Sequence, residues 1–375
     1  MSTIRPISSR LRHRMQRAPS VWTVGVVILV TTLAVNSFGQ TQIRTLTAPE
    51  VDQIVDHLQT AVRNYVFPDI ATKLEQQSKD RREQYRRIAD PTKLAEQLTA
   101  DMRAVGHDQH LAVVFGQELG VQKTPTPEEV QHAHNFDRAN GYGFRSARRL
   151  PGNVGYIDIA YFSPDPDAGS AIAAAMQFVS GTDSLIMDLR RNGGGSGGTM
   201  NTLASYFFDD VTQLSGVVEK VDGKTQERQH WSMPFVQGPR YLKKPVFILT
   251  SRHTHSAAEV LAYDLKNAHV AILVGDRTSG EATSATGEIS LGFGFSTFIA
   301  NGQMISPVTH GNYIGVGVQP DVQTQSSETL TAAYTLALKA AVPSLDSDEL
   351  KKEKAAASKN PKAALLQEIE GFSQD

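Results

Sequence analysis

The stretch that decides the fold covers residues 245–282 and reads PVFILTSRHTHSAAEVLAYDLKNAHVAILVGDRTSGEA. The apolar run at residues 246–249 predicts a buried strand. Residues 257–265 place alanines and leucines at the spacing of one buried helix face. The helix ends before residues 269–275, which predict the next strand. Ser256 therefore lies where a strand turns into a helix.

Two interpretations of Ser256 are open at this point. Serine is a common N-cap, because its side chain can accept a hydrogen bond from a free N–H group of the first helical turn. A serine in this place can also be a nucleophile, because the partial positive charge of the same N–H groups stabilises an oxyanion. The surrounding sequence has to decide between the two.

Length and composition indicate a globular protein with one large domain or two. The chain has 375 residues, 40% of them hydrophobic, and a formal net charge of −2. This near-neutral charge predicts neither a nucleic acid nor an anionic membrane surface as a partner. The sequence contains no cysteine, which excludes disulfides, thiolate nucleophiles and zinc–thiolate sites.

The first 40 residues have the order of a secretory signal. Arginines precede an apolar run at residues 21–35, and small or polar residues follow, with possible cleavage near Gly39 or Gln40. The apolar run is short for a membrane-spanning helix, which needs about 20 residues, and a retained anchor is the alternative. In both cases we expect an exported protein, periplasmic or extracellular, that touches a membrane only through an uncleaved N-terminal segment.

The rest of the chain predicts helices first and an α/β region afterwards. Residues 45–107 carry apolar side chains at helical spacing and predict a small helical domain, followed by a linker and connecting strands at 108–150. Strands and helices then alternate over residues 151–343, which predicts an α/β domain with a largely parallel sheet. Within it, residues 291–300 predict one strand. Residues 344–375 are charged and alanine-rich, and we interpret them as a solvated C-terminal helix and tail.

A second informative stretch, SLIMDLRRNGGGSGG at residues 184–198, follows a predicted buried strand with a glycine run. Glycines let the backbone approach a ligand closely. The run can form an oxyanion hole or, through Gly193, Gly195 and Gly198, a G-x-G-x-x-G dinucleotide loop. The dinucleotide pattern is weak, because a glycine run matches many patterns by chance. A purely structural turn is the third interpretation.

Taken together, these stretches resemble the carboxyl-terminal processing (tail-specific) peptidase family, especially its branch with the tricorn protease core and interphotoreceptor retinoid-binding protein. The matching segments are DQHL (108–111), NVGYIDIAYF (153–162), LIMDLRRNGGGS (185–196), FILTSRHTHSAAEVLAYDLK (247–266), ILVGDRTSGEA (272–282) and GVGVQPDV (315–322). Each segment alone is loosely defined. Their order and spacing make the resemblance specific, and it covers about residues 45–340.

The resemblance implies a crotonase-like α/β catalytic domain of the ClpP/crotonase type, preceded by a helical bundle. The interval at residues 115–142 is too short for the peptide-binding PDZ insert of some relatives, so we expect none. The implied reaction is serine-type hydrolysis of peptide bonds. Its substrates would be peptides or unfolded proteins, and it would need no cofactor and no metal ion.

The resemblance also implies the residues of the site. The nucleophile maps to Ser256, and the oxyanion hole maps to the backbone N–H groups of Gly194 and Ala257. The general base of the tricorn-like branch maps to His110. An imidazole suits this role, because it titrates near neutrality and can take the proton of a serine hydroxyl.

Two positions depart from the family pattern. The lysine of a serine–lysine dyad would lie at Glu281, so we expect no such dyad. The glutamate that orients the base would lie at Ile314, which cannot accept a hydrogen bond, and losing an orienting group can lower the rate by ~10⁴. Asp108, Glu281 and Glu288 are the open candidates for a replacement. The alternative function is a catalytically weak or inactive protein on this fold that binds a peptide or a hydrophobic ligand.

Other polar residues are interpreted as structural. These are His132, His134, Asp188, Arg190 and Glu259. The sequence shows no carboxylate cluster that would complete a metal site with the histidine pair in the linker. His253 and His255 flank the predicted nucleophile, where they could shape the access of a substrate.

Overall fold

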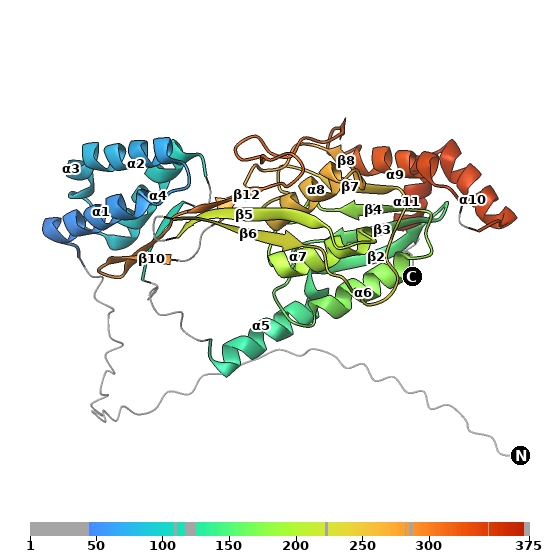
Figure 1. Ribbon diagram of the computed structural model, residues 1–375, viewed down its shortest axis with the longest axis horizontal. Helices are drawn as coiled ribbons and strands as arrows, with labels where there is room; N and C mark the ends of the chain where they lie inside the picture. The colour runs from blue at the N-terminus through green and yellow to red at the C-terminus, as the bar shows by residue number, and fades with distance from the viewer. Residues whose placement is uncertain are drawn as a thin grey trace, which may run out of the picture. The chain divides into compact units, whose positions relative to one another are not determined.

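The computed structural model describes residues 45–108, 111–116, 125–221, 224–281, 283–284, 288–343 and 345–370 (Figure 1). The predicted signal at residues 1–40 and the predicted base His110 lie outside these residues. Within the described ranges, no helix is both long enough and apolar enough to cross a membrane.

The central sheet has six strands in the order β13–β8–β7–β4–β3–β2. The strands are β2 (Phe144–Leu150), β3 (Val154–Ile159), β4 (Ser184–Asp188), β7 (Val246–Thr250), β8 (Ala271–Gly275) and β13 (Val322–Gln323). Neighbouring strands pair in parallel, except that β2 runs antiparallel to β3. Both β4 and β7 are buried along their whole length, as is typical of parallel strands covered on two faces. The prediction of an α/β fold is confirmed, with a mixed central sheet.

Helices pack on both faces of this sheet (Figure 1). Ile248 of β7 belongs to the hydrophobic cluster that includes α6 (Ala168–Val179), α7 (Gly197–Ala204) and α8 (Ala257–Asn267). Its neighbours Phe247 and Leu249 belong to the opposite cluster, with α9 (Thr329–Ala340). This division follows from the alternation of side chains along a strand. A short 3₁₀ turn, η2 (Ser205–Phe207), continues the chain from α7.

The C-terminal segment, which we expected to be a solvated helix and tail, is helical and packs in part against the rest of the protein. It forms α10 (Asp348–Lys359) and α11 (Pro361–Glu370), which bury Ala357 and Leu365 in the cluster beside α9. Arg149 of β2 also donates to the Glu353 carboxylate of α10 at 3.1 and 2.5 Å. The composition did not reveal this packing, because a few apolar side chains among many charged ones are enough to pack one side of each helix.

A helical segment precedes the central sheet. It consists of α1 (Ala48–Val62), α2 (Pro68–Asp80), α3 (Arg82–Tyr85) and α4 (Pro91–Gly106). Ile54, Leu58, Leu94 and Leu98 are buried where these helices meet. After the segment comes β1 (Ala112–Phe115), and farther on α5 (Pro127–Ala139) and the 3₁₀ turn η1 (Gly141–Gly143).

Two antiparallel sheets join parts of the chain that are far apart in sequence. The first has the order β1–β11–β10, with β10 (Glu288–Gly292) and β11 (Phe295–Phe298). The strand predicted at residues 291–300 is present, but it is divided between the end of β10 and the whole of β11. Phe293 and Gly294, with φ of 55° and 83°, turn the chain into a hairpin.

The second antiparallel sheet interrupts the predicted alternation of strands and helices. Its order is β6–β5–β12–β9, with β5 (Gln213–Val221), β6 (Lys224–Trp231), β9 (Thr283–Ser284) and β12 (Gly302–Ile305). The residues of β6, KTQERQHW, are mostly exposed, and their sequence lacks the alternation of apolar and polar residues that predicts a strand. The other end of the sheet is β9, which begins two residues after Glu281, so this sheet reaches the candidate site.

Candidate functional site

Ser256 occupies the turn between β7 and α8, where the sequence places it. Its backbone has φ 52° and ψ −123°, a conformation that residues with a side chain rarely adopt. The side chain is half-buried, so it is not sealed from solvent. Backbone strain of this kind persists only where the surrounding structure holds it, and it is concentrated at functional sites.

The carboxylate of Glu259, one turn into α8, holds this conformation. Glu259 is fully buried. Its donors are the backbone N–H groups of Ser256 (3.1 Å), Gly280 (2.7 Å) and Glu281 (3.0 Å) and the hydroxyls of Thr278 (2.5 Å) and Ser279 (2.7 Å). The sequence interpretation of Glu259 as a simple packing contact missed this role. The available signal was its spacing from Ser256, which is that of a helix capping box.

The glycine run packs directly against Ser256. Gly194 has φ 94°, and a Cβ added to it would lie 2.7 Å from the Ser256 Cβ. Asn192 braces the contact, because its side chain accepts from the Gly194 N–H at 2.8 Å and its carbonyl accepts from the His255 N–H at 3.0 Å. Close approach of the backbone to Ser256 therefore explains why glycine is needed here.

The two N–H groups predicted for an oxyanion hole differ in their surroundings. Ala257 is the first residue of α8, and N–H groups of a first helical turn have no acceptor within the helix. The Gly194 N–H already donates to Asn192 Oδ1. The two residues lie close together, since a Cβ on Gly194 would be 3.1 Å from the Ala257 nitrogen.

An ion pair between Asp188 and Arg190 lies at the end of β4, directly before the glycine run. Arg190 donates to both oxygens of Asp188 at 2.9 and 2.6 Å, and the Tyr156 hydroxyl donates to Asp188 at 2.8 Å. Burial by itself would raise the pKa of Asp188, but the hydrogen bonds and charge of Arg190 outweigh it and the pKa is lowered. These contacts agree with the structural role expected for the pair.

A cavity of about 280 Å³ lies beside the loop that Glu259 holds. Its lining includes Tyr65, Phe67, Asp108, Glu281, Thr283 and Ile314. The Asp108 carboxylate accepts from the hydroxyls of Tyr65 at 2.9 Å and Thr283 at 3.2 Å. Burial raises the pKa of Tyr65, and the charges of Asp108 and Glu281 raise it further. The carboxylates of Asp108 and Glu281 therefore concentrate negative charge in this cavity, close to the turn at Ser256.

Glu281, which lines this cavity, lies beside the imidazole of His255. Its carboxylate lies 3.4 Å from His255 Nε2, and its side chain is only 10% exposed. Ile314, where the family pattern has a glutamate, offers no acceptor. The third candidate carboxylate, Glu288 of β10, accepts from Ser296 within the sheet that contains β1.

Two carboxylates lie beside the linker histidine His134, where the sequence showed no carboxylate cluster. His134 Nδ1 lies 2.8 Å from Asp165 Oδ2, and the possible ligand atoms of His134, Asp165 and Asp167 lie within 4.8 Å of one another. Carboxylates therefore do lie beside this histidine, because folding brings the loop before α6 against α5. The Asp165 side chain also accepts from the Asp167 N–H at 2.9 Å, so the cluster is bonded within itself.

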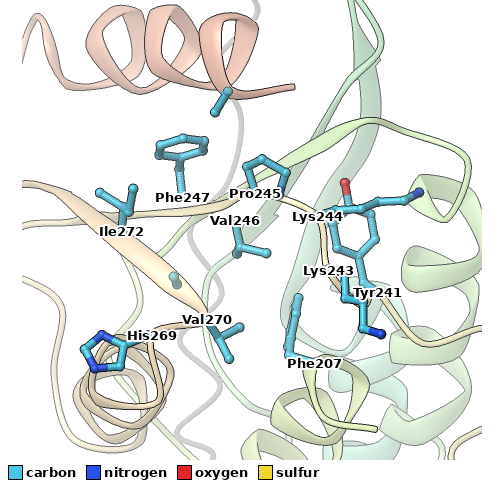
Figure 2. A pocket seen from close by; sticks show the side chains of 12 residues that line it. Phe207, Tyr241, Lys243, Lys244, Pro245, Val246, Phe247, His269, Val270 and Ile272 are labelled. Carbon is cyan, nitrogen blue, oxygen red and sulfur yellow. The ribbon is translucent and has the colours of Figure 1, made fainter. Parts of the chain in front are cut away.

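A larger cavity of about 470 Å³ lies at the end of the central sheet where β7 and β8 begin (Figure 2). Figure 2 shows Lys243, Lys244 and Tyr241 on one side of it and His269 on the other. Lys244 Nζ donates to two backbone carbonyl groups at 2.8 Å. The cavity borders the beginnings of β7 and β8, whereas Ser256 follows the end of β7, so the two features are separate.

Comparisons with known proteins match two parts of the chain. Residues 153–324 match peptidase family S41, and residues 41–138 match the N-terminal domain of peptidase S41 in eukaryotic IRBP. Chloroplastic carboxyl-terminal-processing peptidase 3 of Arabidopsis thaliana is 30% identical over 52% of this chain and 36% of its own length. The carboxyl-terminal-processing protease of Synechocystis is 29% identical over 45% of this chain and 37% of its own. The chain thus spans little more than a third of these relatives.

A solved structure shows the same fold. A lipoprotein from Streptococcus agalactiae aligns with a TM-score of 0.53 at 18% identity, covering 79% of this chain and 98% of that one.

Proposed function

We propose that this chain, which belongs to peptidase family S41, hydrolyses peptide bonds with Ser256 as the nucleophile. The observation that carries the proposal is the strained turn at Ser256. A buried carboxylate holds the turn, and a glycine backbone lies against it. An N-cap alone would not require a φ of 52°, because N-caps ordinarily have extended backbone.

In the proposed reaction the Ser256 hydroxyl attacks the carbonyl carbon of a peptide bond. A histidine takes the hydroxyl proton and passes it to the leaving amine, and water then hydrolyses the acyl-enzyme by the same route. We propose His110 as this base on the family pattern alone. The oxyanion would accept from the N–H groups of Ala257 and Gly194, and Gly194 would first exchange its bond to Asn192.

We also propose the finer classification that the family pattern suggests. The catalytic part, residues 151–343, would be of the ClpP/crotonase type, preceded by the helical domain at 45–107 and the connecting segment at 108–150. The absence of a PDZ insert is supported by the described residues 125–143, which hold α5 and η1. Residues 344–375 would form the C-terminal appendage.

The proposed substrates are peptides or unfolded proteins, with no cofactor and no nucleic acid. The N-terminal sequence supports export, with a membrane contact only through that segment if it is not cleaved.

The test is hydrolysis of casein and of a mixed peptide library by the chain from residue 41 onward. Ser256→Ala and His110→Ala are assayed beside it. The proposal predicts cleavage by the native protein and its loss in both variants. Loss in Ser256→Ala alone would show that His110 is not the base. Equal behaviour of all three would overturn the proposal and favour a binding protein on a peptidase fold.

A further inference from the structure

We propose that the side-chain amide of Asn192 is a third donor of the oxyanion hole, which releases its bond to Gly194 and donates through Nδ2 when the oxyanion forms. This inference rests on the proposed function and deepens it. It adds a side chain to the two backbone N–H groups of Gly194 and Ala257. It does not depend on which histidine is the base.

The first observation is that Asn192 is bonded to both segments that meet at the nucleophile. Its Oδ1 accepts from the Gly194 N–H at 2.8 Å, and its backbone carbonyl accepts from the His255 N–H at 3.0 Å. A Cβ added to Gly194 would lie 2.7 Å from the Ser256 Cβ and 3.1 Å from the Ala257 nitrogen. The amide of Asn192 is therefore one hydrogen bond away from the backbone that contacts Ser256.

The second observation is that one polar atom of this amide has no partner. Asn192 is fully buried, and its Nδ2 has no acceptor among the described residues. A buried donor without an acceptor is unfavourable, and native proteins retain few of them. The Gly194 N–H is itself a donor and therefore requires the amide oxygen at its present place. The unpaired atom is thus a donor, which only an acceptor brought by a ligand would satisfy.

The third observation is that the oxyanion and Asn192 Oδ1 need the same N–H group. An N–H group donates close to its bond direction, so an oxyanion bound to the Gly194 N–H must displace Oδ1 from it. The amide then has to move, and the torsion about its Cβ–Cγ bond has broad, roughly two-fold preferences. A half-turn about this bond removes the oxygen from Gly194 and turns Nδ2 toward the oxyanion that has replaced it.

These observations give the amide a role that begins only when charge develops on the substrate. As Ser256 Oγ bonds to the carbonyl carbon, one electron pair of the C=O bond moves onto the carbonyl oxygen. That oxygen then accepts from Ala257, Gly194 and Asn192 Nδ2. Because Nδ2 is unpaired before this step, its bond stabilises the transition state more than the bound substrate, and it raises kcat without lowering KM.

In the described part of the chain, the charged side chains next to Asn192 in sequence and across the turn already have partners. The pairs are Arg190 with Asp188, Arg191 with Asp158, the ring of His255 with Glu281, and Glu259 with its hydrogen-bond donors. A carboxyl group placed at position 192 would therefore have no free cation beside it, and burial would raise its pKa.

The experiment compares Asn192→Asp with the native chain on one peptide that the native chain cleaves. The substitution preserves the shape of the side chain and an oxygen for the Gly194 N–H, but it removes Nδ2. Loss of one oxyanion-hole donor lowers kcat by about 10²–10³. We therefore expect Asn192→Asp to lose at least about 100-fold in kcat, with KM within about threefold.

The matched control is Asn153→Asp. Asn153 is also a buried asparagine, but it lies before β3, and both polar atoms of its amide are bonded. Its Oδ1 accepts from Arg149 at 3.1 Å, and its Nδ2 donates to the Gly181 carbonyl at 3.1 Å. This variant should keep kcat within about threefold of native, whatever it does to stability.

The pH dependence separates a donor from a structural role. Below its raised pKa, the carboxyl group introduced by Asn192→Asp is protonated and offers both an acceptor oxygen and an O–H donor, as the amide does. The ratio of its kcat to that of the native chain should rise at least about fivefold between about pH 8 and about pH 5.5. A ratio that stays level or falls overturns the inference, as does a kcat within about threefold of native at pH 8.

A second variant covers the case in which Asn192→Asp does not fold, which circular dichroism detects. Asn192→Ser keeps an oxygen that can accept from the N–H two residues on, but its shorter, single polar atom does not replace Nδ2. It should lose at least about 30-fold in kcat, with KM within about threefold. A kcat within about threefold of native overturns the inference.

Failure of the proposed function gives a different result. In that case the native chain neither cleaves peptides nor reacts at Ser256 with a fluorophosphonate probe, and the inference fails with it. If the native chain reacts and Asn192→Asp reacts equally fast, the inference alone fails, because attack on phosphorus also places charge on an oxygen in the hole. A reaction at least about tenfold slower in Asn192→Asp supports it.

Discussion

The fully buried carboxylate of Glu259 accepts a hydrogen bond from the backbone N–H of Ser256 at 3.1 Å, three residues before it. The same carboxylate collects four further donors from residues 278–281. The strained turn of the nucleophile and the loop that carries Glu281 are thus one hydrogen-bonded unit. The unit depends on a side chain that does not touch the substrate in the proposed reaction.

Removing this carboxylate should both destabilise the protein and inactivate it. Glu259→Ala leaves its donors without their acceptor in a buried place, which is expected to lower the free energy of unfolding by about 3–5 kcal/mol. Urea denaturation measures the change, and peptide hydrolysis should fall with it. The control is Glu349→Ala, because Glu349 is exposed on α10. A Glu259→Ala variant as stable as this control would contradict the role of the network.

Two adjacent glycines should respond differently to alanine. Gly194→Ala places a Cβ 2.7 Å from the Ser256 Cβ at a φ of 94°, so we expect a loss of about 1–3 kcal/mol and of most activity. A Cβ on Gly193 meets no atom within 4 Å, so Gly193→Ala should be nearly neutral. Thermal unfolding and hydrolysis of one peptide measure both variants. Equal effects would mean that the contact with Ser256 is not what requires glycine.

Asp264 of α8 should make stability depend on pH in an unusual direction. Burial raises its pKa to about 6, against hydrogen bonds from Ser215 that lower it. Between about pH 4 and 6 the native state therefore binds a proton that the unfolded state has lost, and stability falls as pH rises. The free energy of unfolding of native protein relative to Asp264→Asn should drop by roughly 3 kcal/mol across this window and stay level above it.

Urea denaturation at a series of pH values tests this prediction. Ser215→Ala removes one donor to the ionised Asp264 and should extend the fall to higher pH. A difference between native and Asp264→Asn that is constant from pH 4 to 7, or that grows with pH, would contradict the raised pKa.

Two neighbouring leucines test the packing of α11. Leu365 is 5% exposed and Leu366 is 46% exposed. Leu365→Ala should lower the free energy of unfolding by about 2–5 kcal/mol, whereas Leu366→Ala should change it by about 0.5 kcal/mol or less. Chemical denaturation distinguishes the two. Equal small changes would return the C-terminal segment to the solvated tail that its composition suggests.

Much of the fold was predictable from local sequence. The strand, turn and helix around Ser256 follow from periodicity and turn chemistry within a few residues, and so does the strand that leads into the glycine run. The antiparallel strands were harder. β6 is mostly exposed and carries no alternation, and the turn at Phe293 and Gly294 divides what looks like one strand.

The sequence by itself determined where Ser256 stands in its strand–turn–helix unit, because that placement depends on neighbours along the chain. The tertiary structure alone decided what surrounds it. Gly194 approaches Ser256 across the ends of two strands, and Glu281 lies beside Ile314 through a backbone hydrogen bond between separate loops. Such contacts arise from packing between distant segments, which no local pattern of residues encodes.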